Sequence, residues 1–211
     1  MHQGTVRVHV HAGLTGIVLA GGRSSRFGRD KLAERYRGTP LLHHTLRRVG
    51  ELCDELVLVL APGSGTPDLP PELDVVIARD AAPYEGPLAG AHAGLLAASG
   101  ELALLVGGDM PEPSIPVLAA MVRLAREAEA EAVVLREGDR LRPLPTVVRV
   151  DPARRTAAGL LRAGERRLRS LLGALRTEAL EEGIWVALDP ERRTLLDVDE
   201  PADLESLGPE R

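Results

Sequence analysis

Lysine, amides, cysteine and aromatic residues are scarce in this chain of 211 residues. Lys31 is the only lysine, although lysine and arginine together number 26, so arginine supplies nearly all of the positive charge. Asparagine is absent and Gln3 is the only glutamine. A shortage of amides is typical of heat-adapted proteins, and a biased genome composition produces the same pattern.

These absences exclude several classes of protein. Cys53 is the only cysteine, so the chain has no internal disulfide and no cysteine cluster for zinc, and we expect a reducing cytoplasm. No apolar run has the length of a membrane span. The net charge of −5 argues against nonspecific binding to nucleic acid. The aromatic residues are also too few for a base-stacking platform.

The length and composition fit one globular domain. Hydrophobic residues make up 44% of the chain and charged residues 27%, values typical of a protein with a full core. Residues 1–13 alternate like a short strand and lack the apolar centre of a signal peptide. We interpret 1–13 as an N-terminal extension with no assigned role, and 14–211 as the domain.

Strand-like runs alternate with helix-like patterns along the domain. The expected strands are 15–20, 55–61, 74–78, 101–109 and 131–135, and the expected helices are 40–53, 87–99 and 114–130. Continuous apolar strands joined by helices indicate a mainly parallel sheet that is covered on both faces. The predicted fold class is therefore α/β, in a single three-layer domain.

A glycine-rich loop follows the first expected strand, in the stretch LAGGRSSRFGRDKL at 19–32. Missing side chains at Gly21 and Gly22 would let backbone N–H groups approach an anion, and Arg26 and Lys31 add charge that suits a triphosphate. The alternative is a tight turn with solvated arginines. The loop matches neither the P-loop pattern nor the dinucleotide G-x-G-x-x-G spacing. A lysine where arginine is otherwise the rule suggests a site that needs a compact ammonium.

Aspartates in two further segments are candidate site residues. Asp109 ends an apolar strand in VGGDMP, where it could hold Mg²⁺ beside phosphates or cap the next helix. Asp197 and Asp199 are two residues apart, so in an extended segment they share one face. They could complete a metal site or cap the last helix.

Taken in order, four motifs make the chain resemble the molybdenum cofactor guanylyltransferases. The motifs are LAGGRSSRFGRDK, RDAAPYEGPLAG, GGDMP and DVDEPADL, and the resemblance runs from about residue 15 to 204. That family has a Rossmann-like nucleotidyltransferase fold. The resemblance implies transfer of GMP from GTP to the terminal phosphate of molybdopterin, with Mg²⁺ as cofactor and other molybdenum cofactor biosynthesis proteins as partners.

The resemblance also implies roles for individual residues. The nucleotide would be bound by Leu19, Ala20, Gly21 and Gly22, its triphosphate by Arg26 and Lys31, its guanine by Asp80 and the Mg²⁺ by Asp109. Asp199 is a second metal candidate, and Asp197 and Asp199 are candidates for the acceptor side. A carboxylate at Asp80 could accept from both N–H groups of guanine's pairing edge.

Two motifs depart from the family pattern. Asp197 and Asp199 stand where the family usually has asparagines, and Gly108 stands where it tends to have cysteine. Both changes are closer to the related cytidylyltransferases. Two alternatives therefore stay open: a cytidylyltransferase acting on molybdopterin or another phosphorylated small molecule, and a noncatalytic nucleotide-binding regulator.

An arginine run lies in the C-terminal third. Arg162, Arg166, Arg169 and Arg176 would fall on one face of a helix if that segment were continuous. Such a face is either solvated or a patch for the pterin phosphate.

Overall fold

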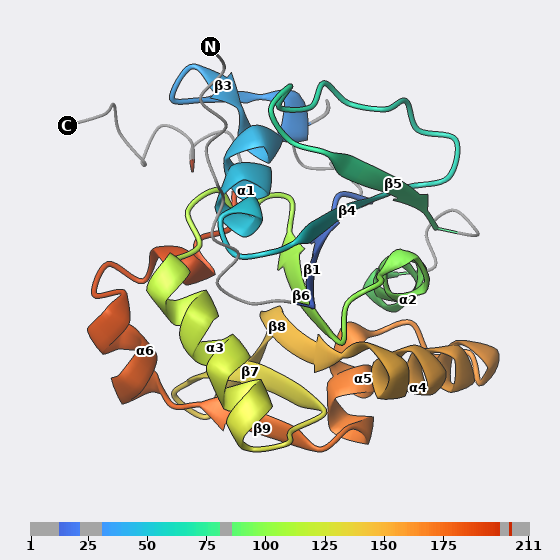
Figure 1. Ribbon diagram of the computed structural model, residues 1–211, viewed down its shortest axis with the longest axis vertical. Helices are drawn as coiled ribbons and strands as arrows, with labels where there is room; N and C mark the ends of the chain where they lie inside the picture. The colour runs from blue at the N-terminus through green and yellow to red at the C-terminus, as the bar shows by residue number, and fades with distance from the viewer. Residues whose placement is uncertain (1–12, 22–30, 81–85, 199–202, 204–211) are drawn as a thin grey trace, which may run out of the picture.

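The computed structural model describes residues 13–21, 31–80, 86–198 and 203 (Figure 1). Within these residues the main sheet has seven strands in the order β5-β4-β1-β6-β8-β7-β9. The strands of this sheet are β1 (Leu14–Leu19), β4 (Glu55–Leu60), β5 (Val75–Arg79), β6 (Leu102–Gly107), β7 (Ala132–Glu137), β8 (Arg140–Arg149) and β9 (Thr177–Leu180).

The sheet is mainly parallel, as the sequence predicts. Strands β5, β4, β1 and β6 run parallel to one another, and β7 is parallel to β9. Within this sheet, as far as the structure describes it, β8 is the one strand that runs antiparallel to both of its neighbours, β6 and β7. A separate two-stranded hairpin joins β2 (Arg35–Tyr36) to β3 (Thr39–Pro40) and was not predicted.

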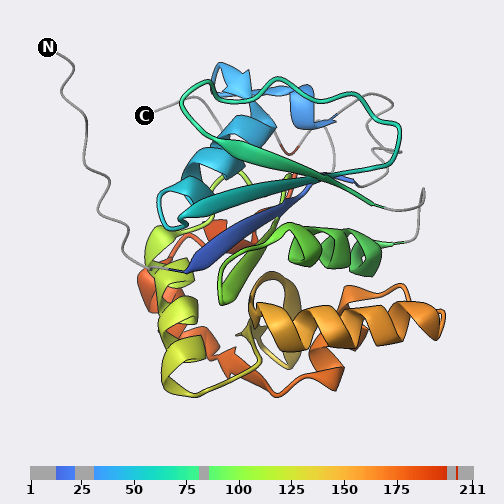
Figure 2. The same ribbon diagram turned by 45° about the vertical axis from the view of Figure 1, so that its right-hand side comes forward.

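Helices cover both faces of the sheet and complete three layers (Figures 1 and 2). One face packs against α1 (Leu41–Gly50), α3 (Ile115–Glu127) and α6 (Glu182–Leu188). The other face packs against α2 (Pro87–Ala97), α4 (Val150–Arg162) and α5 (Leu168–Ala174). Two short 3₁₀ helices, η1 (Lys31–Ala33) and η2 (Arg193–Leu195), lie in the connections. None of the described helices combines the length and the apolar character that crossing a bilayer requires.

The strands of the parallel half are apolar on both faces because each face is buried by a helix layer. In β1, Ile17 belongs to the cluster beneath α2, whereas Val18 belongs to the cluster beneath α1. The fit of α2 is tight, because a Cβ at Gly94 would stand 2.4 Å from Cγ2 of Ile17. A glycine therefore lets the α2 backbone approach the sheet.

The arginine run does not form one helix. Helix α4 ends at Arg162, Gly164 takes the left-handed conformation with φ of 85°, and α5 begins at Leu168. Glu165 then accepts backbone N–H groups of Arg166 and Arg167 at 2.8 and 3.0 Å. The premise of a continuous arginine face is therefore wrong.

Candidate active site

A cleft of about 610 Å³ opens at the carboxyl edge of the parallel strands. Ligands of open α/β sheets bind at this edge, where strand ends and helix starts leave a crevice. The residues that line it come from the ends of β1, β4, β5 and β6, the start of α2, and β8: Leu19, Gly21, Val59, Leu60, Ala61, Pro62, Asp80, Gly86, Pro87, Gly90, Gly107, Asp109 and Leu144.

The glycine loop enters this cleft directly from β1. Leu19 and Gly21 line it, whereas Ala20 packs against the hydrophobic core and donates its N–H to the Val59 carbonyl at 2.8 Å. A Cβ at Gly21 would lie 3.4 Å from the backbone nitrogen of Ala61. The small residue thus keeps this side of the cleft open between the β1 and β4 ends.

Lys31 bonds to two segments that are far from it in the sequence. Its Nζ donates to Oδ2 of Asp109 at 2.7 Å and to the carbonyl of Val198 at 3.0 Å. The lysine side chain is only 15% exposed. Sequence motifs more than 70 residues apart therefore meet at one ammonium group.

Asp109 is not a helix cap. Helix α3 begins at Ile115 and has Ser114 at its N-cap position. The Oδ1 atom of Asp109 lies 2.4 Å from where a Cβ at Gly107 would stand. The carboxylate therefore occupies space at the cleft that exists because residue 107 has no side chain.

Gly107→Ala should displace the Asp109 carboxylate. On the predicted role of Asp109, turnover should then fall about tenfold, since misplacing a catalytic group by about 1 Å costs up to about 10²-fold. Steady-state pyrophosphate release would measure the effect. Gly159→Ala is the matched control, because Gly159 lies in α4, does not line the cleft, and a Cβ there would meet nothing within 4 Å. Equal activity of both variants would show that the position of the carboxylate is unimportant.

Asp80 lines the same cleft from the end of β5, the strand at one edge of the sheet. It follows β5 directly, and its N–H donates to the Leu60 carbonyl at 3.1 Å. It does not cap α2, whose N-cap position is held by Gly86 without a side-chain hydrogen bond.

Gly86 has a φ of 86°, and a Cβ there would stand 2.7 Å from the Arg166 carbonyl. Gly86 and the first turn of α2 are thus held against the α4–α5 connection, where the Leu88 N–H donates to the Arg166 carbonyl at 3.2 Å.

Part of the predicted site lies outside the described residues: Gly22, Arg26 and Asp199. Asp197 is exposed, and the next residue, Val198, donates its N–H to the Asp109 carbonyl at 3.0 Å. This main-chain hydrogen bond holds residue 198, which follows Asp197, beside Asp109.

Sequence reasoning missed Leu144 and Gly107. Leu144 reaches the cleft because β8 runs antiparallel beside β6, with Thr146 opposite Leu105. That pairing has no local signal in the sequence. Gly107 had one, because two successive glycines before a strand-end aspartate indicate a close approach.

Comparison with known families agrees with this geometry. Residues 16–180 match the model of the MobA-like NTP transferase domain. A protein of Chloroflexus aggregans named "Probable molybdenum cofactor guanylyltransferase" is 36% identical over 203 residues, which cover 92% of this chain and 93% of that protein.

Two solved structures share the fold. One is molybdopterin-guanine dinucleotide biosynthesis protein A from Archaeoglobus fulgidus, with a TM-score of 0.75 and 20% identity over 91% of this chain and 95% of that one. The other is 2-C-methyl-D-erythritol 4-phosphate cytidylyltransferase from Thermus thermophilus, with a TM-score of 0.64 and 19% identity over 90% and 95%. The family model and the relative together establish the assignment: the chain belongs to the MobA-like NTP transferase family.

Proposed function

We propose that this chain transfers GMP from GTP to the terminal phosphate of molybdopterin, forming molybdopterin guanine dinucleotide and pyrophosphate. One observation carries the proposal: Gly21, Asp80 and Asp109 line a single cleft, and Lys31 donates a hydrogen bond to Asp109. The name of the Chloroflexus relative supports the same reaction.

The chemistry needs charge neutralisation more than proton transfer. A phosphate oxygen of the acceptor bonds to the α-phosphorus of GTP, and the bond to the oxygen bridging the α- and β-phosphates breaks, so pyrophosphate leaves with that electron pair. The acceptor is already an anion at neutral pH, so no general base is required. Lys31, the Gly21 loop and Arg26 would hold the triphosphate and offset the charge that develops on the leaving group.

Mg²⁺ would be held by Asp109, with Asp199 as a second ligand. The described residues contain no group of three or more His, Cys, Asp or Glu side chains that could enclose a metal. Mg²⁺ fits such a site because it commonly takes one or two carboxylates plus substrate phosphates. The Asp109 carboxylate, which lies against Gly107 beside the cleft, would provide that single protein ligand. When bound, the ion would polarise the phosphoryl oxygens.

Asp80 would select guanine. Asp80 lines the cleft directly after β5, the edge strand, whereas Asp109 lines it after β6, which is separated from β5 by β4 and β1. Guanine presents two N–H donors to an acceptor, whereas adenine and cytosine offer one exocyclic amine there. A carboxylate that accepts both donors makes a charge-assisted pair. Asp197 and Asp199 would lie on the acceptor side, beside the Lys31 contact at Val198.

Asp80→Ala should lower kcat/KM for GTP by an amount that corresponds to about 1.5–3 kcal/mol of lost transition-state stabilisation, the usual contribution of hydrogen bonds to a charged group. The use of ATP and CTP should change little, so the nucleotide preference collapses while activity remains. The measurement is kcat/KM for pyrophosphate release with each triphosphate, Mg²⁺ and molybdopterin.

Asp74→Ala is the matched control, because Asp74 is exposed just before β5 begins, at the strand end opposite to Asp80. A uniform loss across all nucleotides would make Asp80 a structural residue. A wild-type preference for CTP would favour a cytidylyltransferase, which the shared fold of the Thermus enzyme permits. Absence of pyrophosphate release with every nucleotide would favour a noncatalytic regulator.

A further inference from the structure

A buried carboxylate lies outside the cleft, at Glu112. It comes three residues after Asp109, in the connection between β6 and α3, and is only 9% exposed. Burying a charge is unfavourable unless the group is paired and hydrogen-bonded. The surroundings of Glu112 therefore indicate what it holds.

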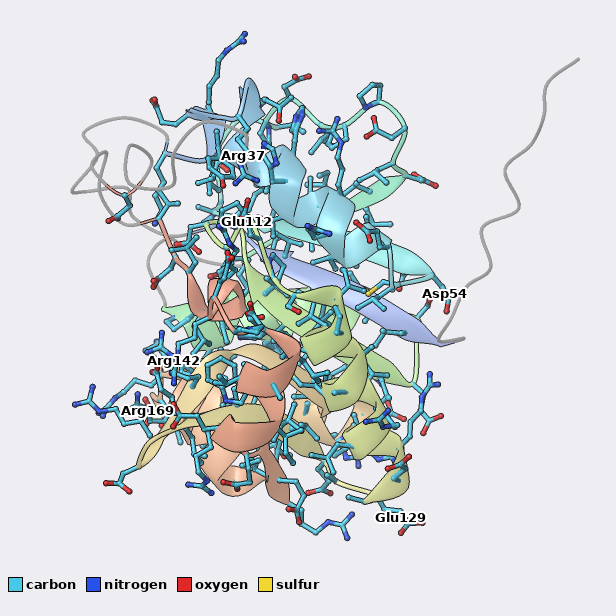
Figure 3. All side chains as sticks on the ribbon, turned by 90° about the vertical axis from the view of Figure 1, so that its left-hand side faces the viewer. Arg37, Asp54, Glu112, Glu129, Arg142 and Arg169 are labelled. Atoms are coloured by element: carbon cyan, nitrogen blue, oxygen red, sulfur yellow. The ribbon has the colours of Figure 1, made fainter. Side chains whose placement is uncertain are left out.

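Donors from two other segments converge on Glu112. The Tyr36 hydroxyl donates to Oε1 at 2.7 Å, and the Arg37 guanidinium pairs with the same oxygen. The Arg193 guanidinium donates to Oε2. Figure 3 shows Arg37 and Glu112 close together. We call Tyr36, Arg37, Glu112 and Arg193 the Glu112 cluster.

Each segment in the Glu112 cluster also leads to the active site. The β2–β3 hairpin that carries Tyr36 follows η1, which begins at Lys31. Arg193 begins η2, and the chain then reaches Val198. The segment after Asp109, the hairpin after Lys31 and the segment before Val198 thus contact one another at two points. One is the Glu112 carboxylate, and the other is the Lys31 ammonium, which contacts both Asp109 and Val198.

A small apolar cluster joins the same segments between these two meeting points. Tyr36, Leu41 and Val198 are buried together, and Leu32 packs against them. Tyr36 belongs to both clusters, because it is buried in the apolar cluster with Leu41 and Val198 while its hydroxyl donates to Glu112. A displaced hairpin would therefore disturb both Lys31 and the carbonyl that Lys31 contacts.

The protonation states of Glu112 and Tyr36 keep their contacts stable at neutral pH. Burial alone would raise the pKa of Glu112, but hydrogen bonds from Tyr36 and Arg193 and the two arginine charges outweigh it and lower the pKa. Burial, helped by Glu112, raises the pKa of Tyr36 to about 12, so its hydroxyl stays a donor. The carboxylate remains ionised at neutral pH.

We infer that Glu112 is a positioning residue for the proposed transfer: it holds the hairpin after Lys31 and the segment before Val198 in fixed relation to Asp109. This inference rests on the proposed function, because the fixed relation matters for a triphosphate that would contact both Lys31 and the Mg²⁺ held by Asp109. Glu112 itself is not among the residues that line the cleft.

The single lysine gives a direct test on the full chain. Glu112→Gln keeps the shape and removes the charge between the two guanidinium groups. We expect the rate at which a succinimidyl ester acylates Lys31, measured by mass spectrometry against the chain's α-amine, to rise several-fold. The kcat of pyrophosphate release should fall about tenfold while the KM for GTP changes little, since misplaced groups chiefly lose transition-state contacts.

Two further variants control the test. Glu191→Gln removes the other carboxylate on Arg193, at 2.6 Å and 70% exposed, and should leave the acylation rate and kcat unchanged. Tyr36→Phe removes one hydroxyl and should give a smaller change in the same direction as Glu112→Gln. It keeps the inference testable if Glu112→Gln does not fold.

Wild-type acylation and kcat in a folded Glu112→Gln variant would overturn the inference, even with a lower melting temperature, because the role would then be structural only. If Glu112→Gln does not fold, wild-type values in Tyr36→Phe would overturn it. A failure of the proposed function looks different: wild-type protein would release no pyrophosphate from GTP. In that case, a Lys31 acylation rate unchanged by Glu112→Gln overturns the inference, and a rise supports the link between the segments.

Discussion

Asp109→Asn is expected to lower the rate of pyrophosphate release by about 10³-fold or more, while the protein stays folded. The amide keeps the size of the side chain above Gly107 but loses the charge that would anchor Mg²⁺ and pair with Lys31. Stability should fall by less than about 1 kcal/mol, because the pair is partly exposed and such ion pairs contribute little. Turnover at saturating Mg²⁺ and the thermal midpoint measure the two effects separately.

The matched control is Asp139→Asn, the same change at an exposed position in the turn between β7 and β8. It should leave turnover and stability at wild-type values. If Asp109→Asn retained wild-type turnover, Asp109 would not be the metal ligand. Its pairing with Lys31 would then be structural.

The architecture and the strand-end residues were predictable from the sequence because their signals are local. The parallel strands β1, β4, β5 and β6 are mostly apolar runs with glycine, proline or aspartate close to their ends. Parallel strands must place their carboxyl ends at one edge. Gly21, Asp80 and Asp109 follow three such strands, so their meeting in one cleft follows from topology.

The contacts between motifs were not predictable in this way. Lys31 meets Asp109 across 78 positions of the sequence, and Tyr36 meets Glu112 across 76. Strands β2 and β3 have two residues each, too few for any periodicity. From the sequence, Glu112 is therefore expected to be an ordinary loop glutamate, although it is buried among arginines in the fold.

The break in the arginine run did have a local signal. Gly164 follows the last turn of α4, its N–H donates to the Leu161 carbonyl at 3.0 Å, and the Glu165 N–H donates to Leu160 at 2.9 Å. A glycine just after a helical pattern marks a helix end of this kind. Glu165 then binds the start of α5, and its bonds from Ser170 and the two backbone amides lower its pKa to about 2.

Replacing the single lysine should have a comparably large effect. Lys31→Ala removes the ammonium beside Asp109 and should lower turnover by about 10²–10³-fold, the usual loss for one preorganised stabilising donor. Lys31→Arg keeps the charge and should still lower turnover at least about tenfold. The ammonium lies between Asp109 and the Val198 carbonyl at 2.7 and 3.0 Å, and a longer planar guanidinium would chelate the Asp109 carboxylate bidentately.

Steady-state kinetics with GTP and molybdopterin measure both variants, and Arg123→Ala, which removes an exposed cation from α3, controls for net charge. A second measurement does not depend on turnover: GTP with Mg²⁺ should protect Lys31 of the wild type from acylation, because the triphosphate would cover the ammonium. Unchanged kinetics in Lys31→Arg would mean that position 31 needs only a positive charge. Unchanged acylation with bound GTP would remove Lys31 from the triphosphate site altogether, and its contact with Asp109 would serve only to join the two motifs.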